Sequence, residues 1–267
     1  MKMYWFERDH QTNESLERRV NELKDAGMDG VMYPFNSYMG DYFTRISRII
    51  DPKSRFKFII AIRPYTISAQ YLSMICLSMS NISKDSIVIN FLTGYLNKRE
   101  QLYGGILTEP NDSSSNIDRS NYMLKYAKDF KLVSENKFFV STTNETVFNN
   151  SVENGFAMII PHVLYKTNRF DVKNQKVVIS IAPIITEDKT HRDYECDNDN
   201  ECRHPADSGC MDLDFFTLEE FFEFLDVSEK RGIHGMLFQE ADFVGQEYDR
   251  ILPAITEYNK RKSELEK

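Results

Sequence analysis

Three features are missing from this 267-residue chain, and each absence excludes a class of protein. No apolar run approaches the ~18 residues that a membrane-spanning helix needs. No basic stripe is present: 33 Lys and Arg stand against 41 Asp and Glu, and the net charge of −8 argues against nucleic acid or an anionic membrane as partner. No linker rich in Pro, Gly and Ser divides the chain, so we expect one domain over 1–267.

Signals for export and for disulfide chemistry are also scarce. The first residues, MKMYWFERDH, lack the basic, apolar and small-residue order of a secretory signal, so we expect a cytoplasmic protein. Of four cysteines, Cys76 lies in an apolar helical stretch and is expected to be a buried small hydrophobe.

The other three cysteines share an acidic segment with two histidines, namely His191, Cys196, Cys202, His204 and Cys210. Their spacing does not match a short zinc knuckle, and free thiols are the interpretation we favour. A tetrahedral zinc site and a loop disulfide remain as alternatives. We therefore assign no metal ligands.

Strand and helix patterns alternate along the chain. Continuous runs of Ile, Val and Phe are typical of parallel strands buried on both faces, and amphipathic helical spacings separate them. This order predicts an α/β fold, a single (β/α)8 TIM barrel, which takes roughly 250 residues. The expected strands are 3–6, 30–35, 56–62, 87–92, 138–140, 156–160, 177–185 and 232–238, and the expected helices are 15–24, 41–50, 69–79, 118–130, 145–150, 217–230 and 247–262.

The stretch 58–94 also indicates where the site lies. Its two apolar runs end in small and polar residues: Arg63, Pro64, Tyr65, Thr66 and Ser68 after the first, and Asn90, Thr93 and Gly94 in the second. In parallel sheets and barrels, ligands bind beyond the carboxyl ends of the strands. We therefore expect the functional site at this end.

Three segments carry a resemblance to a known family. ERRVNELKDAGMDGVMYPF, then RFKFIIAIRPYTISAQYLSMICLSMSNISKDSIVINFLTGY, and the closing GIHGMLFQEADFVGQEYDRILPAI resemble the bacterial luciferase-like flavin-dependent monooxygenases. The branch with alkanesulfonate and pyrimidine monooxygenases matches best. The resemblance implies a luciferase-like barrel, here with shortened insertions.

The resemblance also implies site residues. WFERDH aligns with a first-strand end that carries an active-site histidine, so His10 is the catalytic candidate. Thr66 and Asn90 would touch the flavin ring, with Thr93 and Gly94 beside Asn90. The remaining cofactor-binding candidates, near the phosphate, are Arg119, Ser141, Thr142 and Thr143.

The sequence departs from the family pattern at several positions. Ser120 replaces the tyrosine partner of Arg119, and Ser180 stands where the sulfonate enzymes have a substrate-binding arginine, which speaks against alkanesulfonate. Plain structural interpretations stay open: His10 as an exposed loop residue, Asn90 to Gly94 as an ordinary strand end, Arg63 as half of a salt bridge, and Ser141 to Asn144 as a helix cap.

The function that the resemblance implies is a monooxygenase that uses reduced FMN and dioxygen to oxidise a small organic substrate. A separate flavin reductase would supply the reduced FMN, and a homodimer is left open. Alternatives within the same fold are a deazaflavin-using protein and a flavin-binding barrel without turnover. In the enzymatic interpretations the cofactor brings the redox chemistry and the protein positions it.

Overall fold

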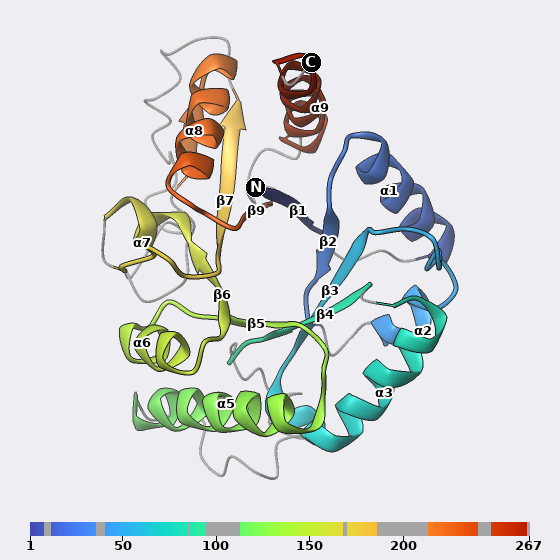
Figure 1. Ribbon diagram of the computed structural model, residues 1–267, viewed down its shortest axis with the longest axis vertical. Coiled ribbons are helices and arrows are strands. Elements are labelled where there is room, and N and C mark those ends of the chain that lie inside the picture. Colours follow the sequence, from blue (N-terminus) through green and yellow to red (C-terminus); the bar gives the residue numbers. More distant parts are fainter. Residues whose placement is uncertain are drawn as a thin grey trace, which may run out of the picture.

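Eight parallel strands close into a barrel in the computed structural model, which describes residues 1–7, 12–35, 41–84, 86–93, 113–167, 170–185, 213–239 and 247–265 (Figure 1). In ring order the strands are β1 (Lys2–Phe6), β2 (Gly30–Tyr33), β3 (Lys57–Ile62), β4 (Ile87–Phe91), β5 (Phe138–Ser141), β6 (Ala157–Pro161), β7 (Val177–Ile185) and β9 (Gly235–Phe238). Strand β9 pairs back onto β1, and every pairing is parallel. The predicted (β/α)8 TIM barrel is confirmed.

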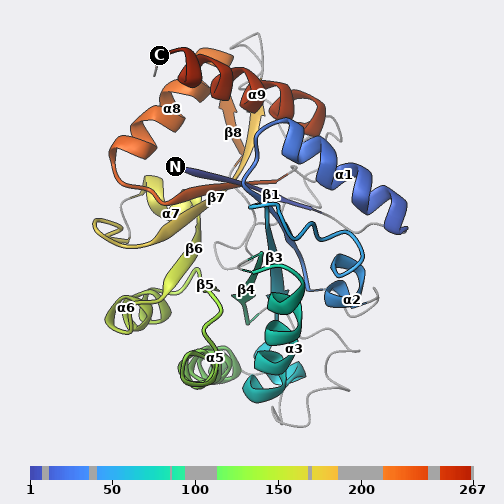
Figure 2. The same ribbon diagram turned by 45° about the vertical axis from the view of Figure 1, so that its right-hand side comes forward.

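Helices cover the outside of the barrel (Figures 1 and 2). They are α1 (Asn13–Asp25), α2 (Tyr42–Ile46), the 3-10 turn η1 (Pro64–Thr66), α3 (Ala69–Ile82), α5 (Ser113–Val133), α6 (Glu145–Glu153), α7 (His162–Lys166), α8 (Leu218–Lys230) and α9 (Glu247–Leu265). Short polar side chains begin several of them: Thr12, Ser68 and Asn144 each accept a backbone N–H three residues on. None of the described helices has the length and apolar character needed to cross a membrane.

Two short elements were not expected from the sequence. Strand β8 (Leu213–Phe216) lies outside the ring and pairs with the last four residues of β7, and α7 follows β6 directly. The phenylalanines at 215 and 216 belong to this strand and not to the helix that follows it. The helix begins only after Thr217, whose side chain caps it in a capping box with Glu220.

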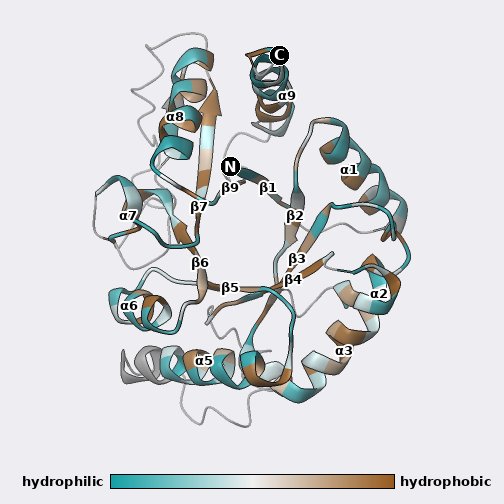
Figure 3. Ribbon diagram, viewed as in Figure 1, coloured by the Kyte–Doolittle hydropathy of each residue, from teal (hydrophilic) through white to brown (hydrophobic). Residues whose placement is uncertain are grey.

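Strand alternation divides the apolar residues into two cores. The barrel interior takes one residue from each ring strand: Tyr4, Met32, Ile59, Val88, Phe139, Ile159, Val178 and Leu237. The outward residues of the same strands pack against the helices in a larger cluster. Both faces of each strand are therefore buried, which explains the continuous apolar runs in the sequence and the brown strands of Figure 3.

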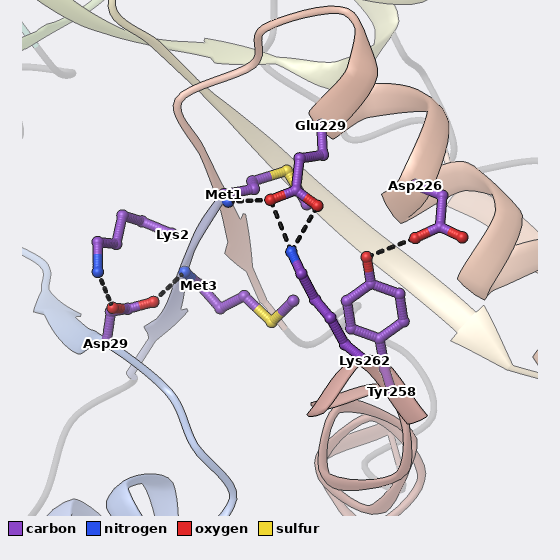
Figure 4. A network of polar contacts seen from close by, with 8 residues as sticks. All are labelled: Met1, Lys2, Met3, Asp29, Asp226, Glu229, Tyr258 and Lys262. Atoms are coloured by element: carbon purple, nitrogen blue, oxygen red, sulfur yellow. Dashed lines mark hydrogen bonds and ion pairs between the residues drawn. The ribbon is translucent and has the colours of Figure 1, made fainter. Parts of the chain in front are cut away.

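Polar contacts join strands and helices at the amino-terminal end of the barrel (Figure 4). Asp29 accepts from the Lys2 Nζ at 2.6 Å and from the Met3 backbone N–H at 2.8 Å. Glu229 on α8 binds Lys262 of α9 at 2.6 and 2.7 Å, and this pairing, with a contact to the amino group of Met1, lowers the Glu229 pKa. These contacts tie the strand ends to the last two helices.

Candidate functional site

A ring of side chains lies one step above the barrel interior, toward the carboxyl ends of the strands. Because side chains alternate along a strand, the residue two positions after each interior residue also faces the barrel axis. We call these eight the carboxyl-end layer: Phe6, Pro34, Ala61, Asn90, Ser141, Pro161, Ser180 and Gln239. The members of the layer from β1 to β3 are apolar. The four polar members are Asn90, Ser141, Ser180 and Gln239, and they form two pairs, each between neighbouring strands.

The first polar pair joins β4 to β5. Ser141 Oγ donates to Asn90 Oδ1 at 2.9 Å, and Asn90 Nδ2 donates to the sulfur of Met32 at 3.5 Å. Asn90 is fully buried, whereas Ser141 is partly exposed. The structure thus brings together two of the predicted flavin-site residues. Asn90 is the buried member of the pair, and Ser141 is the partly exposed one.

The second polar pair joins β7 to β9. Gln239 Nε2 donates to Ser180 Oγ at 2.9 Å, and the Gln239 backbone N–H donates to the carbonyl of Ile181 at 3.0 Å. Sequence reasoning named Ser180 only as a departure from the family and missed Gln239. The signal was present: Gln239 is the polar residue directly after an apolar strand, as Asn90 is a polar residue near the end of β4.

Strand β3 ends in a compact polar turn. Arg63 Nη1 donates to the Tyr65 hydroxyl at 3.0 Å, and the guanidinium lies 5.2 Å from the centre of the Phe35 ring. The Thr66 hydroxyl donates to the Arg63 carbonyl at 2.7 Å and thereby closes η1. Thr66 is partly exposed, so its oxygen lone pairs remain available to a ligand.

The predicted phosphate residues lie around the start of α6 and on α5. The Thr142 hydroxyl is held by Asn144, whose backbone N–H donates to it at 2.9 Å, while Asn144 itself caps α6. The Thr143 hydroxyl is exposed and has no hydrogen-bond partner among the described residues. Arg119 is buried on α5, and this helix contacts η1. Of this group, Thr143 and Arg119 best suit an anion, whereas the Thr142 hydroxyl already serves the turn.

Several predicted residues cannot be placed. His10 and Gly94 lie outside the described residues, as does the whole cysteine and histidine segment 186–212. Thr93 is described and partly exposed, two residues beyond β4. Cys76 is a buried free thiol on α3, and burial raises its pKa to about 12. Within the described part of the chain, no three His, Cys, Asp or Glu side chains gather as metal ligands.

A buried charged cluster lies on the outer side of the barrel, where α7 meets β8. His162 Nδ1 bonds to Asp214 Oδ2, and Lys166 donates to Asp214 Oδ1 at 2.8 Å. Burial by itself raises the Asp214 pKa, but the hydrogen bonds from His162 and Lys166 outweigh it, and the net pKa is lowered. Since Asp214 pairs in register with outward-facing Pro183, this cluster faces the helix layer and not the barrel axis.

A hollow of about 320 Å³ lies between α1 and α9, away from the carboxyl-end layer. Its lining includes Arg19, Glu22 and Tyr248, which are engaged with one another: Arg19 Nη1 binds Glu22 at 3.3 Å, and its guanidinium stacks 3.5 Å above the Tyr248 ring. We regard it as a groove between packed helices, because strand ends supply none of its lining.

Comparison with known proteins gives matches in structure only. No protein-family model matches the sequence, and a search of curated proteins finds no match. EDTA monooxygenase (EmoA) from Chelativorans sp. BNC1 superposes with a TM-score of 0.70 at 9% identity, over 98% of this chain and 94% of that one. Long-chain alkane monooxygenase (LadA) gives 0.66 at 9% identity, over 98% and 91%.

Riboflavin lyase (RcaE), solved with modified FMN and riboflavin, gives a TM-score of 0.61 at 10% identity, over 98% of this chain and 92% of that one. At such identities the likeness establishes the fold, and it says nothing of individual site residues. The architecture expected from the sequence is thus confirmed: the chain has the same barrel fold as EDTA monooxygenase and long-chain alkane monooxygenase.

Proposed function

We propose that this protein is a flavin-dependent monooxygenase that binds reduced FMN and uses dioxygen to oxidise a small organic substrate. The observation that carries the proposal is a barrel of monooxygenase type whose carboxyl-end layer holds two polar pairs on strands β4, β5, β7 and β9. The structure of riboflavin lyase, which contains a modified FMN, supports a flavin as the cofactor.

The residues near β3 to β5 suit a flavin in different ways. Thr66 and Ser141 offer partly exposed oxygen lone pairs to the N–H of a ring, and Asn90 holds Ser141 in place from below. Arg119 and Thr143 would hold the phosphate, with Thr142 shaping the turn between them and α6. Thr93 and Gly94 would line the ring beyond β4.

When bound, reduced flavin supplies the electrons for dioxygen activation. The chain's own residues then bind and orient the substrate and exclude water. In this proposal His10 is the catalytic residue that gives or takes a proton near neutral pH.

The test is a pair of measurements on the purified chain. FMN fluorescence should be quenched on titration with protein, with a dissociation constant in the micromolar range. With photoreduced FMN and a panel of small organic substrates, oxygen uptake should increase only for accepted compounds.

Each other outcome points to one alternative. Absence of FMN binding at tens of micromolar contradicts the proposal. Binding without substrate-dependent oxygen uptake favours a flavin-binding protein without turnover, and selective binding of a deazaflavin favours hydride transfer.

Two partners belong to the proposal. A flavin reductase would supply reduced FMN, because the proposed reaction consumes it. A second copy of the chain is favoured by α3, which has no charged residue among its 14 and exposes Tyr71, Met74 and Leu77 by 57%, 58% and 63% (Figure 3).

The homodimer can be tested by light scattering coupled to gel filtration. Met74→Glu combined with Leu77→Glu should give monomers where the wild type gives dimers. Leu265→Glu, which changes an even more exposed leucine on α9, should leave the dimer intact. A wild-type chain that stays monomeric at 100 µM, far above the ~1 µM dissociation constants of ordinary dimers, would exclude the homodimer.

A further inference from the structure

The two serines of the carboxyl-end layer differ in what they offer a ligand. Ser141 donates its proton to Asn90 Oδ1, so only its lone pairs remain. The orientation of the Asn90 amide is fixed from the other side, because its Nδ2 donates to the Met32 sulfur, which cannot donate. Ser141 is therefore an acceptor.

Ser180 has the opposite polarity. Its Oγ accepts a hydrogen bond from Gln239 Nε2, and it has no acceptor for its own proton among the described residues. Ser180 is partly exposed and faces the barrel axis, so this proton is available to a ligand. Ser180 can therefore donate its O–H to a ligand while it accepts from Gln239.

The Gln239 amide adds the complementary group. Its Nε2 is used by Ser180, and its carbonyl Oε1 has no hydrogen-bond partner in the described part of the chain. Gln239 is almost fully buried as a residue, so its amide is held in place, and its carbonyl oxygen can accept a hydrogen bond from a ligand. Strands β7 and β9 therefore present a donor and an acceptor side by side.

The charge of the surroundings narrows the ligand further. None of the eight residues in the carboxyl-end layer is charged, and Arg63 directly follows β3, four places from β7 in the ring of eight. An anion or a cation at the Ser180–Gln239 pair would lose water without gaining a counter-charge from this layer. A neutral group suffers no such cost.

We propose that Ser180 and Gln239 form a recognition subsite for a neutral amide-type edge, a carbonyl next to an N–H. The carbonyl accepts from Ser180, and the N–H donates to Gln239 Oε1. This inference deepens the proposed function, on which its link to catalysis rests, by naming the substrate class. A flavin ring carries the same edge, so the experiment separates the two sources.

The probe is 2-pyrrolidone, a small lactam with a carbonyl beside its N–H, and binding is followed by ligand-observed NMR. N-methyl-2-pyrrolidone, which lacks the N–H, is the matched probe. We expect the wild type to bind 2-pyrrolidone about tenfold more tightly, the usual value of one neutral hydrogen bond. Equal affinity for the two compounds would overturn the proposal.

Two variants locate the effect. Gln239→Met removes the carbonyl that accepts from the N–H and keeps a side chain of similar length, so it should abolish the preference for 2-pyrrolidone. Ser180→Ala removes the donor to the carbonyl that both compounds carry, so it should weaken both about tenfold and leave the preference in place. The proposal falls if Gln239→Met keeps the preference or if Ser180→Ala weakens neither compound. Gln175→Met, the same change just before β7, should alter neither affinity.

A competition with oxidised FMN then assigns the subsite. If 2-pyrrolidone stays bound at saturating FMN, the edge belongs to the substrate, as we propose. If FMN displaces it from the wild type, the flavin occupies the subsite and the substrate assignment is overturned. If FMN does not bind at all but the lactam preference holds, the subsite stands and the proposed function fails.

Discussion

At the amino-terminal end of the barrel, Glu229 and Lys262 satisfy each other, whereas at the carboxyl-terminal end Ser180 keeps a proton that no described residue accepts. Both regions are built from the same strands, so the difference lies in how the polar groups are used. Paired groups hold the structure together, and groups with spare bonding capacity are ready for a ligand. Changes at the amino-terminal end should therefore alter stability, and changes at the carboxyl-terminal end should alter binding.

The largest expected effect is at Gly30, the first residue of β2. A Cβ there would lie 2.4 Å from the Lys57 carbonyl oxygen on β3, so strand pairing must shift. We expect Gly30→Ala to lower the free energy of unfolding by about 3 kcal/mol in urea denaturation. Gly155→Ala has open space but a φ of +64°, and about 1 kcal/mol is expected. Equal losses would contradict the argument.

The Asp214 cluster tests this comparison, because its charged groups are paired with one another although it lies toward the carboxyl-terminal end of the barrel. Asp214→Asn should cost about 2 kcal/mol at pH 7, since His162 and Lys166 lose a buried partner and Lys166 is half-exposed. The folded Asp214 pKa is lowered, so its contribution is complete above the unfolded pKa of about 4.

The contribution of Asp214 to stability is lost as the pH falls below about 4 and then through the lower pKa that Asp214 has in the folded state. The gap in stability between wild type and Asp214→Asn should therefore narrow from pH 4 to pH 2, measured by thermal unfolding. Asp129→Asn, at an exposed position on α5, should show almost no gap at any pH. A constant gap would mean that the cluster acts through packing.

A binding effect is expected for Arg119. Arg119→Ala should weaken FMN binding about tenfold, or ~1.4 kcal/mol, because the phosphate loses a charged hydrogen bond. Riboflavin lacks the phosphate, so its affinity should not change, and Arg48→Ala at an exposed position should affect neither ligand. Equal weakening for both flavins would place Arg119 in a structural role.

The smallest effect is expected at Glu229. Its pair with Lys262 is partly exposed, so Glu229→Gln should cost only about 0.5–1 kcal/mol in urea denaturation and leave FMN binding unchanged. The more exposed pair of Glu219 with Arg261 offers the comparison, and Glu219→Gln should cost nothing measurable. A change in FMN affinity in Glu229→Gln would contradict the expectation that changes at the amino-terminal end alter stability and not binding.

Much of the fold could be predicted because strands buried on both faces leave continuous apolar runs. FIIAI and GMLF are such runs, and both lie in barrel strands. The four-residue β8 and five-residue α7 were missed because so few residues carry no clear period, and their pairing depends on distant partners. The adjacent phenylalanines of β8 fit a strand or a helix face equally well, so they did not identify the strand.

The site was predictable in position but not in detail. The polar strand end pointed to Asn90 and the family resemblance to Ser141, and both lie in the carboxyl-end layer. The direction of each hydrogen bond depends on residues far apart in sequence, such as Ser180 and Gln239, 59 positions apart. The contact between His162 and Asp214, 52 positions apart, likewise follows no sequence motif.

Strand β7 has nine residues and changes its partners along its length. Its first part pairs with β6 and β9 in the ring, and its last four residues pair with β8 outside the ring. Backbone hydrogen bonding to a neighbouring strand therefore continues from one end of β7 to the other, so this strand is anchored beyond the rim at which the other barrel strands end.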